Sequence, residues 1–574
     1  MTMDAMNSVS SDRKPSSVKD DELSPATGPS STCGATVEAL TEPDDRIETW
    51  RLLMVFACVG LGLFLSLMDA TIVATILVNI SDEFHDFSNS EWVILSYTLS
   101  EVGFAVILAR LSDAIGRKTV IVGSFALFLA SSMACGASTT LNQLIGFRAV
   151  QGIGGAGLFA MALIITTEMS PPGAIAYVSL YVGIILVMGG VIGPVIGGLF
   201  STYSDWRWVF WINGPCTFVP IVLLLAFWPK KYQIAKTVKL KDLDWVGAFL
   251  VMAGSILPVF IVQQTALGEY AWKSATTIII LILSALCWIA LAYWQWDISW
   301  RPRFRHIQPQ FPWAILTDRV MMAALVNTIL AGFVYLLLLV NIPIRAQIVN
   351  AYNPIKSAVL LLPMLGGGSV GCGLSGMLSA KKHRTFLTLN VASGLMIVGS
   401  GLLTTIPDTF EPAARQWGYE AILGFGVGMN LATIVMLSLY YMEFEHHAVT
   451  QGLIAQMRVF GGSIGVAVSF IVLHDRTQKM MKDILTPKQL DDMSKSPLAI
   501  LTFSLPQILR ARETYVSAFK VDMQICLGIS AACLVASLCT YERNPCNPVV
   551  RAKEFEDYMQ EHRDAAKAAK NENH

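Results

Sequence analysis

The sequence predicts an all-α polytopic membrane protein with about fourteen spanning helices. Hydrophobic residues make up 54% of the 574 residues and charged residues only 14%, whereas soluble proteins usually carry about 25% charged residues. Apolar runs of about 20 residues recur along the chain, which is the length needed to cross a bilayer core roughly 30 Å thick. The lipid bilayer is therefore the first partner expected.

The apolar runs give the order of the elements. A polar stretch over 1–48, rich in Ser, Thr, Asp and Pro, is expected to be a disordered cytoplasmic tail, and 541–574 a charged cytoplasmic tail. Residues 474–515, before the last span, are expected to form a long extracellular loop. The predicted spans lie near 52–77, 91–111, 119–138, 142–167, 175–201, 207–228, 244–265, 274–296, 316–341, 355–379, 385–406, 416–441, 450–473 and 516–540.

The loop charges predict the orientation. The loop over 79–90 contains no Lys or Arg, whereas 110–118 and 230–241 contain several of them. Loops rich in Lys and Arg face the cytoplasm. With an even number of spans, both termini are expected on the cytoplasmic side.

Composition also excludes several classes of function. The net charge of −1 provides no field that would recruit nucleic acid. The ten cysteines form no CxxC pair and no Cys/His cluster, so neither a disulfide framework nor a metal site is expected. There is no P-loop, HExxH or nucleophile–base string. We therefore expect no enzyme, no catalytic residues and no cofactor.

A first motif, ARLSDAIGRKTVIV, covers 109–122 between the second and third spans. A tight turn there needs the conformational freedom of Gly116. Asp113 can cap the following helix or pair with Arg117 and Lys118. Such a charge cluster can lock two helix bundles at the cytoplasmic side. An ordinary positive loop would explain the basic residues but not the whole string.

A second motif, RAVQGIGGAG, covers 148–157 in the fourth span. An arginine inside a span is costly unless it is paired or hydrated, so Arg148 requires a partner. Asp69 of the first span lies at a similar depth and is the best candidate, although the pair could be purely structural. Gln151 and Gly152 belong to the same motif. Its GxGxxG pattern lacks the strand that a dinucleotide site requires.

A third motif, GGVIGPVIGGLF, covers 189–200 in the fifth span. Small residues spaced by four positions form a smooth face for a neighbouring helix. A proline inside the span removes a backbone hydrogen bond and can kink it. Generic helix packing would be the alternative interpretation. The motif residues are Gly189, Gly193 and Gly197, and beside them Pro194 and Gly198.

Two further charged residues lie within spans. Glu101 is the second intramembrane acid that we identify, and it could bind substrate, carry a proton, or form a hydrogen bond at a helix interface. Arg458 is expected near the cytoplasmic interface, with its head group extending to water.

Candidate substrate contacts are polar residues of later spans. Together with the many Phe, Trp and Met residues, they suit an amphipathic organic molecule, although most of those aromatics are better explained by packing or contact with lipid. The candidates are Asn327, Tyr335, Asn430 and Gln456.

The three motifs, in this order, resemble those of the major facilitator superfamily: its loop 2–3 motif, its helix 4 motif and the helix 5 motif of antiporters. The runs LMDATIVATIL (67–77) and DWRWVFWINGP (205–215) resemble the fourteen-span drug:proton antiporter branch, particularly fungal multidrug and secondary-metabolite (mycotoxin-type) efflux pumps. Two positions depart from the first motif, because Ala109 replaces its opening glycine and Ala114 replaces a basic residue.

The resemblance implies the major facilitator fold, with one six-helix bundle over 49–228, a second over 301–540, and two additional helices in the linker over 229–300. It implies export of drugs or secondary metabolites in exchange for protons by alternating access. A proton-coupled exporter needs a carboxylate whose proton affinity changes with its surroundings. Our hypothesis is that Asp69 carries the coupling proton and Arg148 tunes it.

Other functions stay open at this point. A carrier of nutrients such as amino acids or siderophores could share the fold, as could a non-transporting membrane sensor. With no ATP-binding motif, the energy source is expected to be an ion gradient, of protons or of sodium. We expect a monomer in the plasma membrane, with the vacuolar membrane as the alternative.

Overall fold

The computed structural model describes most of the chain after residue 48. The described residues are 49–84, 92–170, 175–229, 239–301, 307–381, 384–407, 413–482, 484–486, 489, 503–543 and short parts of 550–558. The expected tail over 1–48, most of the tail over 541–574 and the middle of the loop over 474–515 lie outside these residues.

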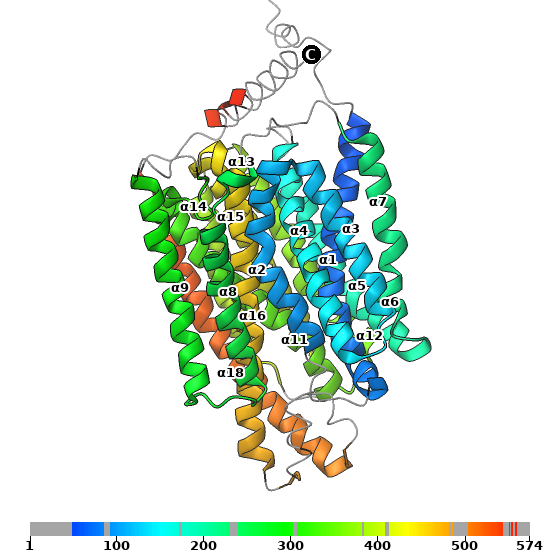
Figure 1. Cartoon of the computed structure of the whole chain (residues 1–574). Helices are drawn as coiled ribbons and strands as arrows, with labels where there is room; N and C mark the ends of the chain where they lie inside the picture. The colour runs from blue at the N-terminus through cyan, green and yellow to red at the C-terminus, as the bar shows by residue number, and fades with distance from the viewer. Residues whose placement is uncertain are drawn as a thin grey trace, which may run out of the picture. The chain divides into compact units, whose positions relative to one another are not determined.

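Fourteen helices of the described part are long and apolar enough to cross a membrane, which confirms the predicted number (Figure 1). Two of these spans are each built from a short and a longer helix, α6 with α7 and α12 with α13. The helices up to α9 are α1 (Thr49–Phe84), α2 (Trp92–Ile115), α3 (Arg117–Gly136), α4 (Leu141–Glu168), α5 (Ile175–Tyr203), α6 (Trp208–Trp211), α7 (Asn213–Phe227), α8 (Trp245–Ala266) and α9 (Ala275–Trp300).

Two of the remaining helices change the bounds of the predicted loop. They are α10 (Trp313–Thr317), α11 (Arg319–Val349), α12 (Pro354–Val359), α13 (Leu362–Lys381), α14 (Thr385–Leu403), α15 (Ala414–Tyr441), α16 (His447–Met481) and α18 (Leu505–Leu538). The ends of the predicted loop over 474–515 are thus helical. They are helical because Leu473 and Met481 of α16 pack with Ala511 and Tyr515 of α18 in one apolar cluster.

Several helices begin at a polar residue whose side chain accepts a hydrogen bond from a free backbone N–H group. Thr140 accepts from the backbone N–H of Gln143 at the start of α4, and Asp318 accepts from that of Met321 in α11. Asp244 caps α8 through Gly247 and also accepts from the side chains of Trp294 and Gln295 in α9. One buried carboxylate therefore fastens α9 to α8.

The helices form two groups of close neighbours. In the first helical group (α1 to α7), α1 packs on α4, α5 and α7, and α4 also packs on α2 and α3. In the second helical group (α11 to α18), α11 packs on α16 and α18, and α15 packs on α13 and α14. The main contacts between the groups join α5 to α13 and α2 to α16.

The two additional helices are placed differently from each other. α8 packs on α2, α16 and α9, so it touches both helical groups, and Gln456 of α16 donates a hydrogen bond to Ser255 of α8 at 2.9 Å. α9 is mostly exposed, with Ile279 61% and Ile289 65% exposed. Apolar side chains exposed on a spanning helix face lipid, so α9 is an outer helix.

Candidate transport site

Asp69 and Arg148 form a buried ion pair between α1 and α4. Asp69 is 0% exposed and Arg148 1% exposed. The terminal nitrogen of Arg148 that donates to Asp69 Oδ2 also donates to Gln151 Oε1 at 2.8 Å. Arg148 Nε donates to the carbonyl of Val93 at 3.0 Å. The arginine is thus held by a carboxylate, an amide and a backbone oxygen, as a buried cation requires.

The other oxygen of Asp69 is held by two amides. Gln151 Nε2 donates to Asp69 Oδ1 at 3.0 Å and Asn213 Nδ2 at 3.2 Å. Asn213 also donates to Ser132 Oγ at 3.1 Å, which links α7 to α3. Sequence reasoning missed Asn213, although an amide at the start of the apolar helix after DWRWVFWINGP was a usable signal. Four helices therefore contribute to one polar cluster around Asp69.

Glu101 lies beside this cluster, joined to it by two hydroxyl groups. The Arg148 guanidinium lies 4.3 Å from the centre of the Tyr97 ring. Tyr97 Oη is 3.2 Å from Ser66 Oγ, and Ser66 Oγ donates to Glu101 Oε1 at 3.5 Å. Ser66 is one turn before Asp69 in α1. The structure therefore brings together all three residues expected to act in proton coupling.

The glycines of α4 allow its neighbours to come close enough to build this cluster. A Cβ atom at Gly152 would lie 2.3 Å from the carbonyl oxygen of Tyr97, and one at Gly155 would lie 2.3 Å from the Tyr97 hydroxyl. The glycine-rich motif over 148–157 is thus a packing surface for α2 as well as the sequence that carries Arg148.

The glycines of α5 have two different neighbours. A Cβ atom at Gly189 would lie 2.8 Å from that of Leu67, and one at Gly193 would lie 2.9 Å from the carbonyl oxygen of Met68, so both face α1. Gly190 instead faces Leu365 of α13. The remaining motif residues Pro194, Gly197 and Gly198 are buried. α5 therefore contacts α1 on one side and the second helical group on the other.

Gly193→Ala should lower the melting temperature of the detergent-solubilised protein. The added methyl group would also lie 2.0 Å from Thr71 Oγ1, so α1 and α5 must separate, and overpacking of this kind costs about 1–3 kcal/mol. Gly394→Ala is the matched control, because no atom lies within 4 Å of a Cβ at Gly394. Equal melting temperatures for the two variants would show that α5 does not need this close approach.

The turn between α2 and α3 carries a charge cluster. Gly116 has φ +97°, which L-residues with side chains rarely adopt. Arg117 donates to Asp113 Oδ1 at 2.5 Å and forms two parallel bonds to Glu168, at 2.9 and 3.1 Å. Glu168 is the last residue of α4, and sequence reasoning missed it. Arg110 also pairs with Asp113, at 3.3 Å.

Two expectations for this turn need correction. Asp113 does not cap α3. The N-cap residue of α3 is Gly116, and no side chain caps this helix, because the Asp113 carboxylate is held by Arg110 and Arg117. Lys118 donates to the carbonyl of Leu225 in α7 at 3.0 Å. The cluster of Arg110, Asp113, Arg117 and Glu168, called the gate cluster below, therefore connects α2 and α3 to α4.

The same end of the molecule joins the two helical groups. Thr167, next to Glu168, forms a hydrogen bond of 3.0 Å with His447 at the start of α16. Arg110 Nε donates to the carbonyl of Pro309, which precedes the second group, at 3.0 Å. A Cβ atom at Gly452 of α16 would lie 2.6 Å from that of Ala109 in α2. In this conformation the groups are in contact at the end that carries the gate cluster.

Three of the four residues expected to contact substrate lie outside the two cavities described below. Asn430 donates to Asn327 at 2.7 Å, and Asn327 donates to the carbonyl of Cys533 at 2.9 Å. These bonds join α15, α11 and α18 inside the second helical group. Gln456 is fully buried against α8. Tyr335 differs, because it lines a cavity between α5 and the second group.

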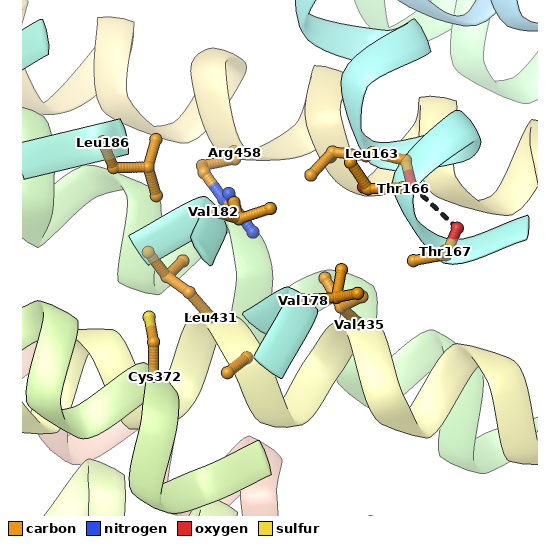
Figure 2. A pocket seen from close by; sticks show the side chains of 11 residues that line it. Leu163, Thr166, Thr167, Val178, Val182, Leu186, Cys372, Leu431, Val435 and Arg458 are labelled. Atoms are coloured by element: carbon orange, nitrogen blue, oxygen red, sulfur yellow. Dashed lines mark hydrogen bonds between the residues drawn. The ribbon is translucent and has the colours of Figure 1, made fainter. Parts of the chain in front are cut away.

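Two neighbouring cavities lie between the helical groups. The first is called the Arg458 cavity and is shown in Figure 2. The second is called the Tyr335 cavity. They share Leu186, Cys372 and Leu431. Side chains leave little free room in either, so a large organic molecule requires the groups to move apart.

Sequence reasoning also missed two buried acids of the second group. Asp522 Oδ2 accepts from Asn341 at 2.9 Å and from Ser469 at 2.8 Å. Glu420 accepts from Gln416 at 2.7 Å. Both lie inside long helices, where an isolated acidic residue was a visible signal. Asp69 and Glu101 are therefore not the only intramembrane acids in the described residues.

The fold, the paired charges and the glycine-rich contacts can now be compared with known proteins. The sequence model of the family described as Major Facilitator Superfamily matches residues 59–466. The chain belongs to the major facilitator superfamily. This superfamily consists of membrane transporters and not of enzymes, as the sequence motifs predicted.

Similar members of the superfamily come from fungi and bacteria. The chain is 34% identical over 508 residues to the MFS-type transporter FPY5 of Fusarium mangiferae, which covers 86% of this chain and 84% of the relative. It is 29% identical over 412 residues to Multidrug resistance protein 3 of Bacillus subtilis, covering 71% and 77%. It is 26% identical over 486 residues to the MFS-type efflux pump LUC4 of a Fusarium species, covering 84% and 82%.

Solved transporter structures share the fold. A bacterial homologue of the human lysosomal transporter Spinster, in an inward-facing and occupied conformation, has a TM-score of 0.54 at 14% identity, covering 86% of this chain and 97% of that chain. The human organic anion transporter MFSD10 has a TM-score of 0.50 at 12% identity, covering 83% and 99%. At such identities the likeness concerns the major facilitator fold alone.

Proposed function

We propose that this chain exports amphipathic organic molecules in exchange for protons by alternating access, with rocking bundles over 49–228 and 301–540. The observation that carries the proposal is the buried pair of Asp69 and Arg148, since a charged pair inside a spanning region marks a proton or substrate path. Relatives named efflux pump and multidrug resistance protein support the direction of transport.

The hydrogen bonds around Asp69 suggest how a proton is coupled to movement. As a carboxylate, Asp69 accepts from Arg148, Gln151 and Asn213. A protonated carboxyl group no longer balances the arginine charge, so proton binding and the ion pair compete. Because Asp69 lies in α1 and its partners lie in α4 and α7, loss of the pair frees these helices to shift relative to one another. Glu101, reached through Ser66, is the second proton site.

The gate cluster closes the cytoplasmic end in this proposal. The positive charges at the α2–α3 turn support a cytoplasmic position for that end and for both termini. Contacts such as Thr167 with His447 break when the two bundles rock toward the inward-open state. The proposed location is the plasma membrane, and the working unit is a monomer.

Uptake into inside-out membrane vesicles tests the proposal. A panel of amphipathic compounds is supplied with and without an imposed proton gradient, acid inside. We expect accumulation that collapses when a protonophore is added, because the exporter then loses its energy source. Accumulation that is indifferent to the gradient would instead indicate a facilitator or coupling to another ion.

A further inference from the structure

Arg458 is a buried cation for which the described residues provide no ion-pair partner. It lies about three turns into α16 and is 5% exposed, so its head group does not extend to water as the sequence led us to expect. Its Nε atom and one terminal nitrogen are buried and have no hydrogen-bond partner among the described residues. A guanidinium in such surroundings is costly unless something binds it.

The other buried arginines of the described part each donate to at least one protein oxygen. Arg148 pairs with Asp69, and Arg110 pairs with Asp113. Arg345 donates to the side chain of Gln416 at 3.3 Å and to a backbone carbonyl. Each of these arginines is bound by protein oxygens, whereas Arg458 has no such bond to any residue that the structure describes.

The cavity around Arg458 offers no negative charge of its own. Figure 2 shows the Arg458 guanidinium among apolar side chains from α4, α5 and α15, with Cys372 of α13 beside them. The polar residues of the lining, apart from Arg458, are Thr166, Thr167 and Cys372. Both threonine hydroxyls donate to carbonyl oxygens of α4 one turn earlier. A ligand in this cavity therefore meets one cation and an apolar wall.

The cavity also lies where a transported molecule must pass. Its lining comes from both helical groups, which move relative to each other in the proposed mechanism. The neighbouring Tyr335 cavity shares Leu186, Cys372 and Leu431 with it, so the two spaces adjoin. Together they suit a molecule with an apolar body and one anionic end.

We propose that Arg458 binds the anionic group of the cargo, and that the cargo is an amphipathic organic anion such as a carboxylate. This rests on the proposed export function and adds its substrate class. The guanidinium fork matches a carboxylate in two parallel hydrogen bonds. The apolar body of the cargo lies against α5 and α15, toward Tyr335.

Binding is tested by the melting temperature of the purified protein with a matched pair of probes, pyrenebutanoate and pyrenebutanol. We expect the carboxylate to raise the melting temperature of the wild type but not of Arg458→Met, and the alcohol to act equally on both. Arg458→Met alone should melt higher than the wild type, because an unpaired buried charge has been removed. Arg415→Met, at an exposed position, is the matched control and should behave as the wild type.

Several results would overturn the inference. One is a carboxylate effect that is absent from the wild type or equal in both proteins. Another is an equal rise with chloride alone, which would assign the cavity to an inorganic ion. A third is a lower melting temperature for Arg458→Met, since Arg458 would then be a structural residue.

Vesicle uptake separates this inference from the proposed function. We expect Arg458→Met to lower pyrenebutanoate uptake at least tenfold, because the charge-assisted hydrogen bonds to the carboxylate are lost, and to leave pyrenebutanol uptake unchanged. Arg458→Lys should recover part of the loss, because it restores the charge but not the fork. Proton-driven uptake that is insensitive to Arg458→Met refutes the inference alone. Anion-dependent stabilisation without any gradient-driven uptake refutes the export function alone.

Discussion

Asp69→Asn is expected to reduce gradient-driven transport to the background of empty vesicles and to destabilise the protein. The substitution leaves the Arg148 charge buried without its counter-ion, and breaking a buried pair in this way costs about 3–5 kcal/mol. A cost of about 3 kcal/mol corresponds to a factor of roughly one hundred in an equilibrium. The amide also cannot carry a proton, so coupling is lost even in molecules that fold. Both effects are measured on the same preparation, by uptake and by melting temperature.

The double variant Asp69→Asn/Arg148→Gln separates these two effects. With both charges removed, the melting temperature should return toward that of the wild type, while transport stays at background. Asp475→Asn is the matched control, because Asp475 pairs with Lys479 at an exposed site and should tolerate the change. If Asp69→Asn still accumulates cargo under a proton gradient, the coupling proton lies elsewhere, and Glu101 and Asp522 become the candidates.

The second large effect is expected for Arg117→Gln in the gate cluster. Arg117 is bound to Asp113 and Glu168, and each of these three side chains is 10% exposed or less. Without Arg117, Asp113 keeps only Arg110, and Glu168 loses both of its bonds to Arg117, so α2 and α4 separate at this end. A penalty of about 3 kcal/mol would shift the closed state by roughly a hundredfold relative to the open one. We expect transport to fall at least tenfold.

The closed state can be measured directly, because Thr167 and His447 are in contact across the two helical groups. In a background without the native cysteines, Thr167→Cys/His447→Cys should cross-link readily on oxidation, and adding Arg117→Gln should lower the yield. Arg510→Gln removes an arginine from an exposed pair with Glu513 and serves as the control. An undiminished cross-link in the Arg117 variant would mean that the gate cluster does not hold this end closed.

The fold could be predicted from the sequence because the bilayer imposes a simple rule on it. Every spanning segment must satisfy its backbone within a helix about 20 residues long, and the fourteen runs were visible as such. The bounds predicted for the loop over 474–515 were wrong, because hydropathy shows where a helix leaves the lipid and not where the helix ends. The apolar contacts of Leu473 and Met481 with α18 continue both helices beyond that point.

The site could be predicted only in part. Arg148 stood out because an arginine in an apolar run needs a partner, and the depth of Asp69 suggested which one. Asn213 and Glu168 complete the two charge clusters through contacts between distant segments, which no local pattern encodes. Arg458 was placed wrongly because snorkelling assumes a path to water, and the packing of α16 against the first helical group removes that path.

The most direct test of the account is proton movement driven by cargo. The purified protein is placed in liposomes that contain a pH-sensitive dye and have an acidic lumen, and the compound that vesicles accumulate best is added outside. The account predicts that the lumen becomes more alkaline in step with cargo entry, and that Asp69→Asn abolishes both. Cargo entry without any change in lumenal pH would contradict proton-coupled export.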